Sequence, residues 1–525
     1  MGQVIGIDFG TTTTEVSYIK DNGVRSLKLE DGHYYIPTVL FFKSEDDYII
    51  GYEAERYSRN QDYSEAVVRN FKLDLTSKTV KYNVVAKDGT AFSIKPQKAA
   101  QLFLNRLLQI IQPKLIKIFG DKEGIIDKAV ITVPALFNPA EKEVIKSALL
   151  KAATNAGFNE IKIAAEPTAA AVAYSDFEDI NEEQSILVYD FGGGTFDVSV
   201  IKKGKNKFEE IETDGDKSLG GNLITERIAE HLWYEFCDTY NMDDLPFEKE
   251  DAISYSEDEY GLEKSKYYWN RAEILSIAEE MKIQLSSEND EDEETASLYN
   301  MNGDLINAQL SMTYNTFKKI IKKVINKTIE ITANVVQRAE KKINYFVLAG
   351  GSSSIKMIRE IISEDPILKN LNLCDDDDGQ TLISRGAAIL ANAKLSTDEK
   401  TRFELGVSAK DGANFNAFIP IIESGVSLPC TGKRRFQIDN RDFVKICYYE
   451  KDVKKYPNAC RTDDDGIDLV SELYIDVPEN LYAELEVTFN IEKDGTPSIS
   501  AEIIDETGNV ISSKEIVIRR DGELW

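Results

Sequence analysis

Two short segments of the chain share one order of residues, and this repetition constrains the fold more than any other feature. VIGIDFGTTTTEVSYI at 4–19 and VYDFGGGTFDVSV at 188–200 each lead from an apolar run through Asp-Phe-Gly and a turn of small residues into a second apolar run. Each segment is typical of a strand, a tight turn and a second strand. One glycine turn alone is weak evidence, because such turns are common. Two in the same context predict a duplicated unit.

Length and charge limit the class of protein. A chain of 525 residues is too long for one compact core, so we expect about two to four domains. Its 42% hydrophobic and 29% charged residues are typical of a soluble globular protein. The formal net charge of −29 would repel nucleic acid and anionic lipid. No apolar run reaches the roughly 20 residues that a membrane span needs. We therefore expect neither nucleic acid nor membrane as a partner.

Cysteine and histidine usage narrows the chemistry further. The five cysteines include no CxxC pair, which fits a reducing compartment. Only two histidines are present, so a histidine-rich zinc site or a Ser-His-Asp triad has little support. The chain starts without the basic and apolar pattern of a signal peptide. These features predict a cytoplasmic protein.

The pattern of apolar residues changes once along the chain. Up to about residue 395, strand-like and helix-like runs alternate, which predicts an α/β layered fold. Later runs alternate apolar and polar residues, as in ELEVTFNI at 484–491, and turn dipeptides separate them. That pattern predicts antiparallel strands. We expect an α/β domain over 1–395, a linker over 396–403 and an all-β domain over 404–525.

The glycine turns suggest a chemistry. A turn of glycine and threonine presents unshielded backbone N–H groups, which bind phosphate oxygens, and the hydroxyls of Thr11, Thr12 and Thr195 add donors. The aspartates that end the preceding strands, Asp8 and Asp190, suit Mg²⁺ held between carboxylates, water and phosphate. Two such hairpins facing each other would enclose a polyphosphate. The alternative is that each glycine cluster is only a tight turn.

Several motifs together resemble one family. IGIDFGTTTT, AVITVPALFN, AAEPTAAAVAY, VYDFGGGTFDVSVI, DKSLGG and FVLAGGSSSI occur in this order, and the set resembles the 70-kilodalton heat-shock chaperones of the DnaK type. That family belongs to one ATPase superfamily with actin and sugar kinases. The resemblance covers nearly the whole chain. It implies a two-lobed, actin-like α/β ATPase domain with a duplicated core, followed by an all-β sandwich that binds peptides.

The resemblance also implies roles for individual residues. Asp8 and Asp190 would hold Mg²⁺ through its waters. From the residues alone, Lys72 would be a surface lysine. The residues expected to carry the chemistry are Lys72 beside the γ-phosphate, Thr195 on the β- and γ-phosphates, Glu166 near the metal waters and Asp197 near the attacking water. The residues expected to contact ATP or ADP are Thr11, Thr12, Gly192, Gly193, Gly194, Gly220, Gly221, Glu279, Lys282, Ser286, Gly350, Gly351 and Ser352.

In the β domain, four positions match the peptide pocket of the family. Val407, Phe436, Val444 and Ile446 would line that pocket, and an equally good interpretation places them in the sandwich core. The sequence also departs from the family. The linker STDEKTR is polar where the family has a leucine-rich strand, and we expect no helical lid after the sandwich. These differences predict weak, fast peptide exchange and reduced coupling between the domains.

Three substitutions fall near the expected nucleotide site. Ser354 replaces an arginine that stacks on adenine in the family, Asn222 replaces the usual acid after LGG, and Gln380 replaces another acid. They predict that phosphate binding is kept better than adenine binding.

The leading hypothesis is a DnaK-type chaperone that binds Mg-ATP, hydrolyses it slowly and binds extended apolar segments of unfolded polypeptides. A J-domain co-chaperone and a nucleotide-exchange factor would be its partners. The alternative is a nucleotide-binding scaffold or co-chaperone with little ATP turnover. A small-molecule kinase is disfavoured, because the β domain would have no role in it.

Overall fold

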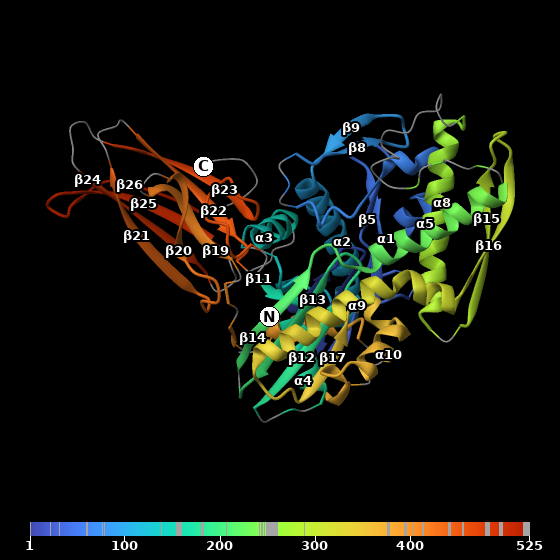
Figure 1. Cartoon of the computed structure of the whole chain (residues 1–525), viewed down its shortest axis with the longest axis horizontal. Helices are drawn as coiled ribbons and strands as arrows, with labels where there is room; N and C mark the ends of the chain where they lie inside the picture. Colours follow the sequence, from blue (N-terminus) through green and yellow to red (C-terminus); the bar gives the residue numbers. More distant parts are fainter. Residues whose placement is uncertain are drawn as a thin grey trace.

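The computed structural model consists of an α/β part followed by a β part (Figure 1). It describes residues 2–517 except 22, 31, 59–60, 76, 78, 138, 154–159, 179, 181–182, 206, 241, 243–244, 246, 248–260, 288, 375–378, 393–395, 399, 402, 412–413, 439–442, 454–455, 478–482 and 493–496.

The first α/β unit is built on a 6-stranded sheet with the order β11-β10-β1-β2-β3, to which β4 adds by pairing with β2. Its strands are β1 (Gln3–Phe9), β2 (Thr13–Lys20), β3 (Gly23–Ser26), β4 (Tyr35–Pro37), β10 (Ile126–Val133) and β11 (Glu160–Ala165). Strand β1 lies inside the sheet, and its alternate residues Ile5, Ile7 and Phe9 are fully buried. They pack with the apolar face of α2 (Pro96–Phe119) and with α3 (Pro139–Ala153) in one core.

Smaller elements extend this unit. Strands β5 (Val39–Phe42), β6 (Tyr48–Ile50) and β7 (Val67–Arg69) form a 3-stranded sheet, which α1 (Gly51–Ser58) covers. The short helix η1 (Gln61–Ala66) precedes β7, and β8 (Tyr82–Val85) with β9 (Ala91–Ile94) forms a hairpin. The turn between β7 and β8 carries Lys72.

The second α/β unit has a 5-stranded sheet with the order β17-β12-β13-β14-β18. Its strands are β12 (Gln184–Phe191), β13 (Phe196–Lys203), β14 (Lys207–Asp216), β17 (Tyr345–Ala349) and β18 (Ser396–Asp398). The helices and other strands of this unit are α5 (Gly221–Tyr240), α8 (Lys264–Leu285), the hairpin β15 (Glu291–Tyr299) and β16 (Leu305–Thr313), α9 (Tyr314–Ala339), η2 (Gly351–Ser354), α10 (Lys356–Glu364) and η3 (Leu368–Asn370).

The two sheets repeat one arrangement around the Asp-Phe-Gly segments. Strand β1 pairs antiparallel with β2 and parallel with β10, and β12 pairs antiparallel with β13 and parallel with β17. Asp8 and Asp190 therefore stand at the same place, near the end of a strand that has one antiparallel and one parallel neighbour. This repetition fits the duplicated unit predicted from the sequence.

Two helices join the sheets. Helix α4 (Glu166–Phe177) and helix α11 (Leu382–Asn392) pack against each other, α11 also contacts β1, and α4 contacts β12. Their contact is rich in alanine, and Gly386 of α11 lies so close to Ala169 of α4 that a Cβ atom at Gly386 would be 1.7 Å from the Ala169 carbonyl oxygen. Small side chains thus let the two helices approach closely between the units.

The segment between the α/β part and the β part is attached at both ends. Strand β18 pairs in parallel with the start of β14, with Thr397 opposite Phe208. A few residues later, the hydroxyl of Thr401 donates to the Glu423 carbonyl (2.8 Å) and accepts from the Val426 amide (3.0 Å). The described residues of the polar linker are therefore held by main-chain and hydroxyl hydrogen bonds.

The β part consists of two 4-stranded sheets, seen on one side of the molecule in Figure 1. The antiparallel strands predicted from the alternating pattern are present, and Leu485, Val487, Phe489 and Ile491 of β24 all point into the shared core. One sheet has the order β20 (Asn414–Ile422), β19 (Glu404–Asp411), β22 (Phe443–Lys451), β23 (Ile467–Asp476), and the other β21 (Cys430–Ile438), β24 (Ala483–Ile491), β25 (Pro497–Asp505), β26 (Val510–Val517). None of the helices in the described ranges is long and apolar enough to cross a membrane.

Candidate functional site

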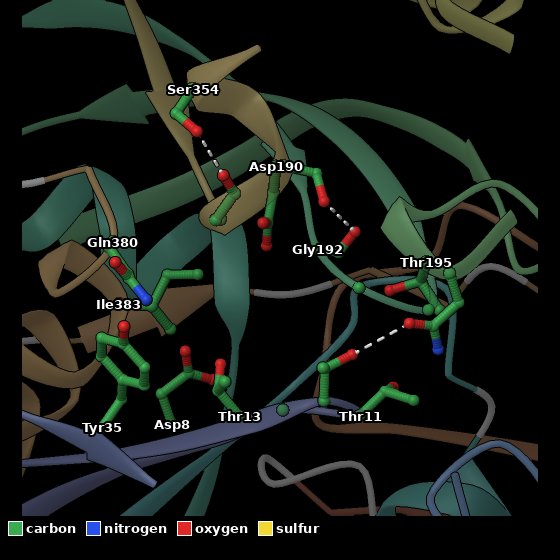
Figure 2. A pocket seen from close by; sticks show the side chains of 18 of the residues that line it. Asp8, Thr11, Thr13, Tyr35, Asp190, Gly192, Thr195, Ser354, Gln380 and Ile383 are labelled. Atoms are coloured by element: carbon green, nitrogen blue, oxygen red, sulfur yellow. Dashed lines mark hydrogen bonds between the residues drawn. The ribbon is translucent and has the colours of Figure 1, made fainter. Parts of the chain in front are cut away.

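A cavity of about 300 Å³ lies between the two α/β units. Both glycine hairpins open into it, and Figure 2 shows Asp8 from β1 and Asp190 from β12 on opposite sides with their carboxylates pointing into the same space. Most of the residues predicted for nucleotide and metal binding line it: Asp8, Thr11, Thr12, Lys72, Glu166, Asp190, Gly192, Gly193, Gly194, Thr195, Glu279, Lys282, Ser286, Gly350, Gly351 and Ser352.

The two hairpins touch each other, and glycine makes this possible. A Cβ atom at Gly193 would lie 1.9 Å from the Thr12 hydroxyl oxygen, and one at Gly194 would lie 2.7 Å from that of Thr11. Any larger residue at these positions would push the hairpins apart. The backbone N–H groups and threonine hydroxyls of both turns are thus brought to one end of the cavity, where they can bind phosphate oxygens.

A buried ion pair lies at this same end. Lys72 Nζ is 3.0 Å from Glu166 Oε1, and both side chains are almost fully buried. Lys72 also stands over the rings of Phe9 and Phe137, 5.7 Å from each centroid. Glu166 is the first residue of α4, directly after β11. The alternative that Lys72 is an ordinary surface lysine does not agree with this burial.

Negative charge is concentrated around Lys72. Burial, followed by repulsion from Glu166, raises the pKa of Asp8 to about 7, although Lys72 and a hydrogen bond from Thr132 oppose the shift. Burial also raises the pKa of Asp190 well above its usual value, and Glu166, Asp197 and Asp8 add to the shift. Burial raises the pKa of Glu166, with Lys72 opposing.

This donor set fits Mg²⁺ bound through water and phosphate. The clustered carboxylates repel one another, and a divalent cation would relieve that repulsion. No group of three or more His, Cys, Asp or Glu side chains within the described ranges is arranged to enclose a metal by itself. Mg²⁺ commonly keeps several waters and uses one or two carboxylates together with substrate phosphates. Asp8 and Asp190 are suited to that mode.

Another part of the cavity wall is formed by α8, η2 and the start of α11. Lys282 Nζ donates to Glu279 Oε2 (2.6 Å), to Thr225 Oγ1 (3.0 Å) and to the Gly221 carbonyl (3.3 Å). The hydroxyls of Ser286 and Ser352 donate to the carbonyls of Lys282 and Gly192. The hydrogens of the Lys282 ammonium group and of both serine hydroxyls are already used in these bonds. Glu279, Ser286 and Ser352 therefore present mainly acceptor oxygens to a ligand.

The loop before η2 depends on a glycine. Gly350 has φ +79°, a left-handed conformation that favours glycine. A Cβ atom there would lie 2.6 Å from Asp190 Oδ1. The predicted loop Gly350–Ser352 is therefore held directly against the second aspartate.

Three predicted residues do not line the cavity. Asp197 is opposite Asp190 in the β12–β13 pair and accepts a hydrogen bond from the Leu136 amide (3.0 Å). Gly220 packs on the backbone of Gly193, and Gly221 lies against the Ser352 hydroxyl. Asp197, Gly220 and Gly221 thus lie behind the residues that line the cavity and support them.

Several lining residues escaped the sequence prediction. Glu15 is the cross-strand neighbour of Asp8 on β2, and Tyr35 on β4 is the neighbour of Glu15. Figure 2 shows Tyr35 close to Gln380 and Ile383, on the side of the cavity away from Thr11 and Thr195. Only knowledge of strand register would have placed Glu15 and Tyr35 here. The others are Gly10, Thr13, Ile283, Ile355 and Ile383, while Asn222, Ser354 and Gln380, noted as substitutions, also line it.

The four positions predicted for peptide binding lie in the β part. Val407, Val444 and Ile446 are buried in the core between the two sheets, and Phe436 is partly buried against that core. This placement suits the sandwich-core interpretation and leaves the peptide-pocket interpretation a prediction.

Comparison with known proteins identifies the family. The model of the family described as "Hsp70 protein" matches residues 4–409. Relatives named "Chaperone protein DnaK" include one from Thermosipho africanus, 27% identical over 95% of this chain and 77% of the relative. One from Mycoplasma mobile is 29% identical over 95% of this chain and 76% of the relative. One from Mycoplasma mycoides subsp. mycoides is 29% identical over 99% of this chain and 80% of the relative.

The family model spans both hairpins, the Lys72 turn, the Gly350 loop and the start of the β part. The chain therefore belongs to the Hsp70 family, the family of DnaK-type chaperone ATPases.

Proposed function

We propose that this protein is a DnaK-type chaperone whose two α/β units form the lobes of an actin-like ATPase core and bind Mg-ATP between them. The observation that carries the proposal is the cavity in which two Asp-ended glycine hairpins meet beside the buried Lys72–Glu166 pair. Phosphoryl transfer to water depends on positioning and charge stabilisation more than on covalent chemistry. A cavity of this composition supports that chemistry.

The phosphates of ATP are assigned to the end of the cavity between the hairpins. Thr11, Thr12 and Thr195, with the backbone amides of both turns, would hold the β- and γ-phosphates. Lys72 would stabilise the charge that develops on the γ-phosphate in the transition state. Asp8 and Asp190 would hold Mg²⁺, which supplies charge neutralisation when bound.

The water that attacks the γ-phosphate needs an orienting acceptor. Glu166 lines the cavity and is oriented by its ion pair with Lys72, so we assign this role to Glu166. Asp197 would act indirectly, because it does not line the cavity and its carboxylate accepts a hydrogen bond from the Leu136 amide. The adenosine part is assigned to the end formed by Glu279, Lys282 and Ser286 and by the Gly350–Ser352 loop.

The β part is assigned to extended apolar segments of unfolded polypeptides. A J-domain co-chaperone and a nucleotide-exchange factor are the partners that the family implies. The five cysteines include no CxxC pair, and on that basis we assign a reducing, cytoplasmic location.

The test measures ATP turnover by the whole chain with and without a reduced, unfolded model polypeptide. A basal Mg-dependent rate that the polypeptide stimulates is expected. Calorimetry of the Asp8→Asn/Asp190→Asn double variant should show weak or absent Mg-ATP binding in a protein that remains folded. Unchanged affinity in that variant would contradict the assignment.

The alternative is a nucleotide-binding scaffold or co-chaperone with little turnover. Ser354 favours it, because it stands in the cavity with its hydroxyl bonded to the Gly351 carbonyl (2.7 Å) and offers no flat cation to stack on a base. Stable retention of ATP without release of phosphate would support this alternative.

A further inference from the structure

Asn222 connects the two α/β units at the phosphate end of the cavity. It is the second residue of α5, and its backbone amide donates to the Gly193 carbonyl (2.7 Å), which fixes it to the second hairpin. Its side chain reaches the first unit in two places. Asn222 Oδ1 accepts from the Thr12 hydroxyl (3.4 Å), and Asn222 Nδ2 donates to Asn70 Oδ1 (3.3 Å).

Both partners belong to segments assigned to phosphate binding. Thr12 is in the turn of the first hairpin. Asn70 has a left-handed φ of 60° and starts the turn that carries Lys72, where the Leu73 amide donates to the Asn70 carbonyl (3.2 Å). One amide side chain thus links three segments: the second hairpin, the first hairpin and the Lys72 turn.

An amide suits this position because it accepts and donates at once. Asn222 therefore accepts from Thr12 and donates to Asn70 with one neutral side chain. It adds no negative charge to a cavity that Asp8, Glu166 and Asp190 also line.

We propose that Asn222 is a positioning residue that bridges the two α/β units and slows the release of bound nucleotide. The proposal rests on the proposed function, since it presupposes a nucleotide between the hairpins. For the nucleotide to leave, the units must separate, and separation breaks the Asn222–Asn70 bond. The Thr12 hydroxyl has one hydrogen, so a phosphate oxygen and Asn222 Oδ1 compete for it, while the bond to Asn70 can persist beside the ligand.

The experiment measures release of a fluorescent N-methylanthraniloyl-ADP from the full chain in the presence of Mg²⁺, by stopped flow. The variants are Asn222→Ala, Asn70→Ala and the double variant. Asn70 does not line the cavity, so its loss removes the bridge without removing a lining residue. A partly exposed hydrogen bond of this kind contributes modestly, so each single variant should release the nucleotide about 3- to 10-fold faster.

The decisive result is the double-mutant cycle. The double variant should release no faster than the faster single variant, because both changes break one bridge. Additive effects, or release at the wild-type rate in both single variants, would overturn the proposal. Asn307→Ala is the matched control, since this exposed asparagine also makes one long hydrogen bond, with Ser297 at 3.3 Å, on the β15–β16 hairpin. It should leave release unchanged.

Failure of the bridge can be distinguished from failure of the proposed function. If the wild-type chain binds the analogue with Mg²⁺ and the cycle shows no coupling, the bridge is wrong and the function stands. If the wild-type chain does not bind the analogue at all, the proposed function is wrong, and with it the bridge. Thermal unfolding midpoints of all variants should stay close to wild type, which excludes a general loss of structure as the cause of faster release.

Discussion

At the scale of single residues, the buried Lys72–Glu166 pair carries the proposed chemistry of the site. A lysine with 2% of its surface exposed must have its charge compensated, and Glu166 at 3.0 Å provides this. Breaking a buried pair by removing one partner typically costs about 3–5 kcal/mol, because it leaves a buried charge alone. Under the proposed function, stability and catalysis depend on the same two side chains and need separate tests.

Lys72→Met should slow single-turnover ATP hydrolysis by at least about 100-fold, because the lost charge acts mainly in the transition state. It should also lower the free energy of unfolding. The Lys72→Met/Glu166→Gln double variant should recover most of that stability and none of the rate. Quenched-flow hydrolysis and urea denaturation measure the two effects. A Lys72→Met rate near wild type would remove Lys72 from the catalytic site.

A pH dependence of stability follows from Asp8. Its pKa is raised from 3.8 to about 7, chiefly by burial. The folded protein therefore holds a proton on Asp8 more tightly than the unfolded chain does, and this stabilisation is lost as the pH rises through about 7. In EDTA, the free energy of unfolding should fall between pH 5 and pH 8, and Asp8→Asn should reduce the slope. An equal slope in both proteins would show that Asp8 titrates at its usual pKa.

At the scale of elements, the hairpins were predictable and their neighbours were not. The residues that form each turn, Asp-Phe-Gly and the small residues after it, are adjacent in the sequence. The ends of β1 and β12 could therefore be placed from the sequence. Glu15 and Tyr35 reach the cavity through the pairing of β1 with β2 and of β2 with β4. Nothing in the local sequence reveals that non-local register. Lys72 was found through the family resemblance alone.

The linker pairs through its main chain, which its polar sequence did not reveal. Strand β18 pairs with β14, and the reduced coupling between the domains stays a prediction. Hydrogen bonds of this kind tolerate many side chains, so composition alone was a poor guide. The pattern of hydrophobic residues predicts which side chains are buried. It does not predict which polar segment pairs with an exposed edge strand.

Thr397 permits a test of this pairing. Thr397→Pro removes an N–H group and restricts the backbone, so it should disrupt β18. Thr397→Ala keeps the main chain and is the matched control. Coupling between sites is typically about 1–3 kcal/mol, and the altered linker predicts a smaller value here. Thr397→Pro should remove most of whatever difference the wild-type chain shows between peptide affinities measured with ATP and with ADP. Fluorescence anisotropy of a labelled peptide measures it. Equal coupling in the Pro and Ala variants would show that β18 does not transmit the nucleotide state.

At the scale of the whole molecule, the order of α/β and β parts followed from periodicity, because a change from alternating elements to period-two patterning is visible along the chain. The cavity between the units did not follow from periodicity, since it depends on how the α4–α11 contact sets the two sheets against each other. The structure has separate apolar cores for the first unit, the second unit and the β part.

Separate cores predict that the parts unfold separately and respond differently to nucleotide. A ligand that binds only the folded state stabilises the part that holds it, by about 2.7 kcal/mol at a concentration of 100 times Kd. Because α4 and α11 pack together and contact both α/β sheets, the two α/β units should unfold as one part, and differential scanning calorimetry should show two transitions. Mg-ATP should raise the midpoint of the α/β transition by several degrees, and EDTA should reverse this rise. The midpoint of the β transition should move far less, because the β part can be stabilised only through the β18 contact.

In the Asp8→Asn/Asp190→Asn variant neither midpoint should respond to Mg-ATP. If both midpoints rose together by the same amount in the wild-type chain, the two parts would form one cooperative unit, and the linker pairing would be only one element of a larger interface between them.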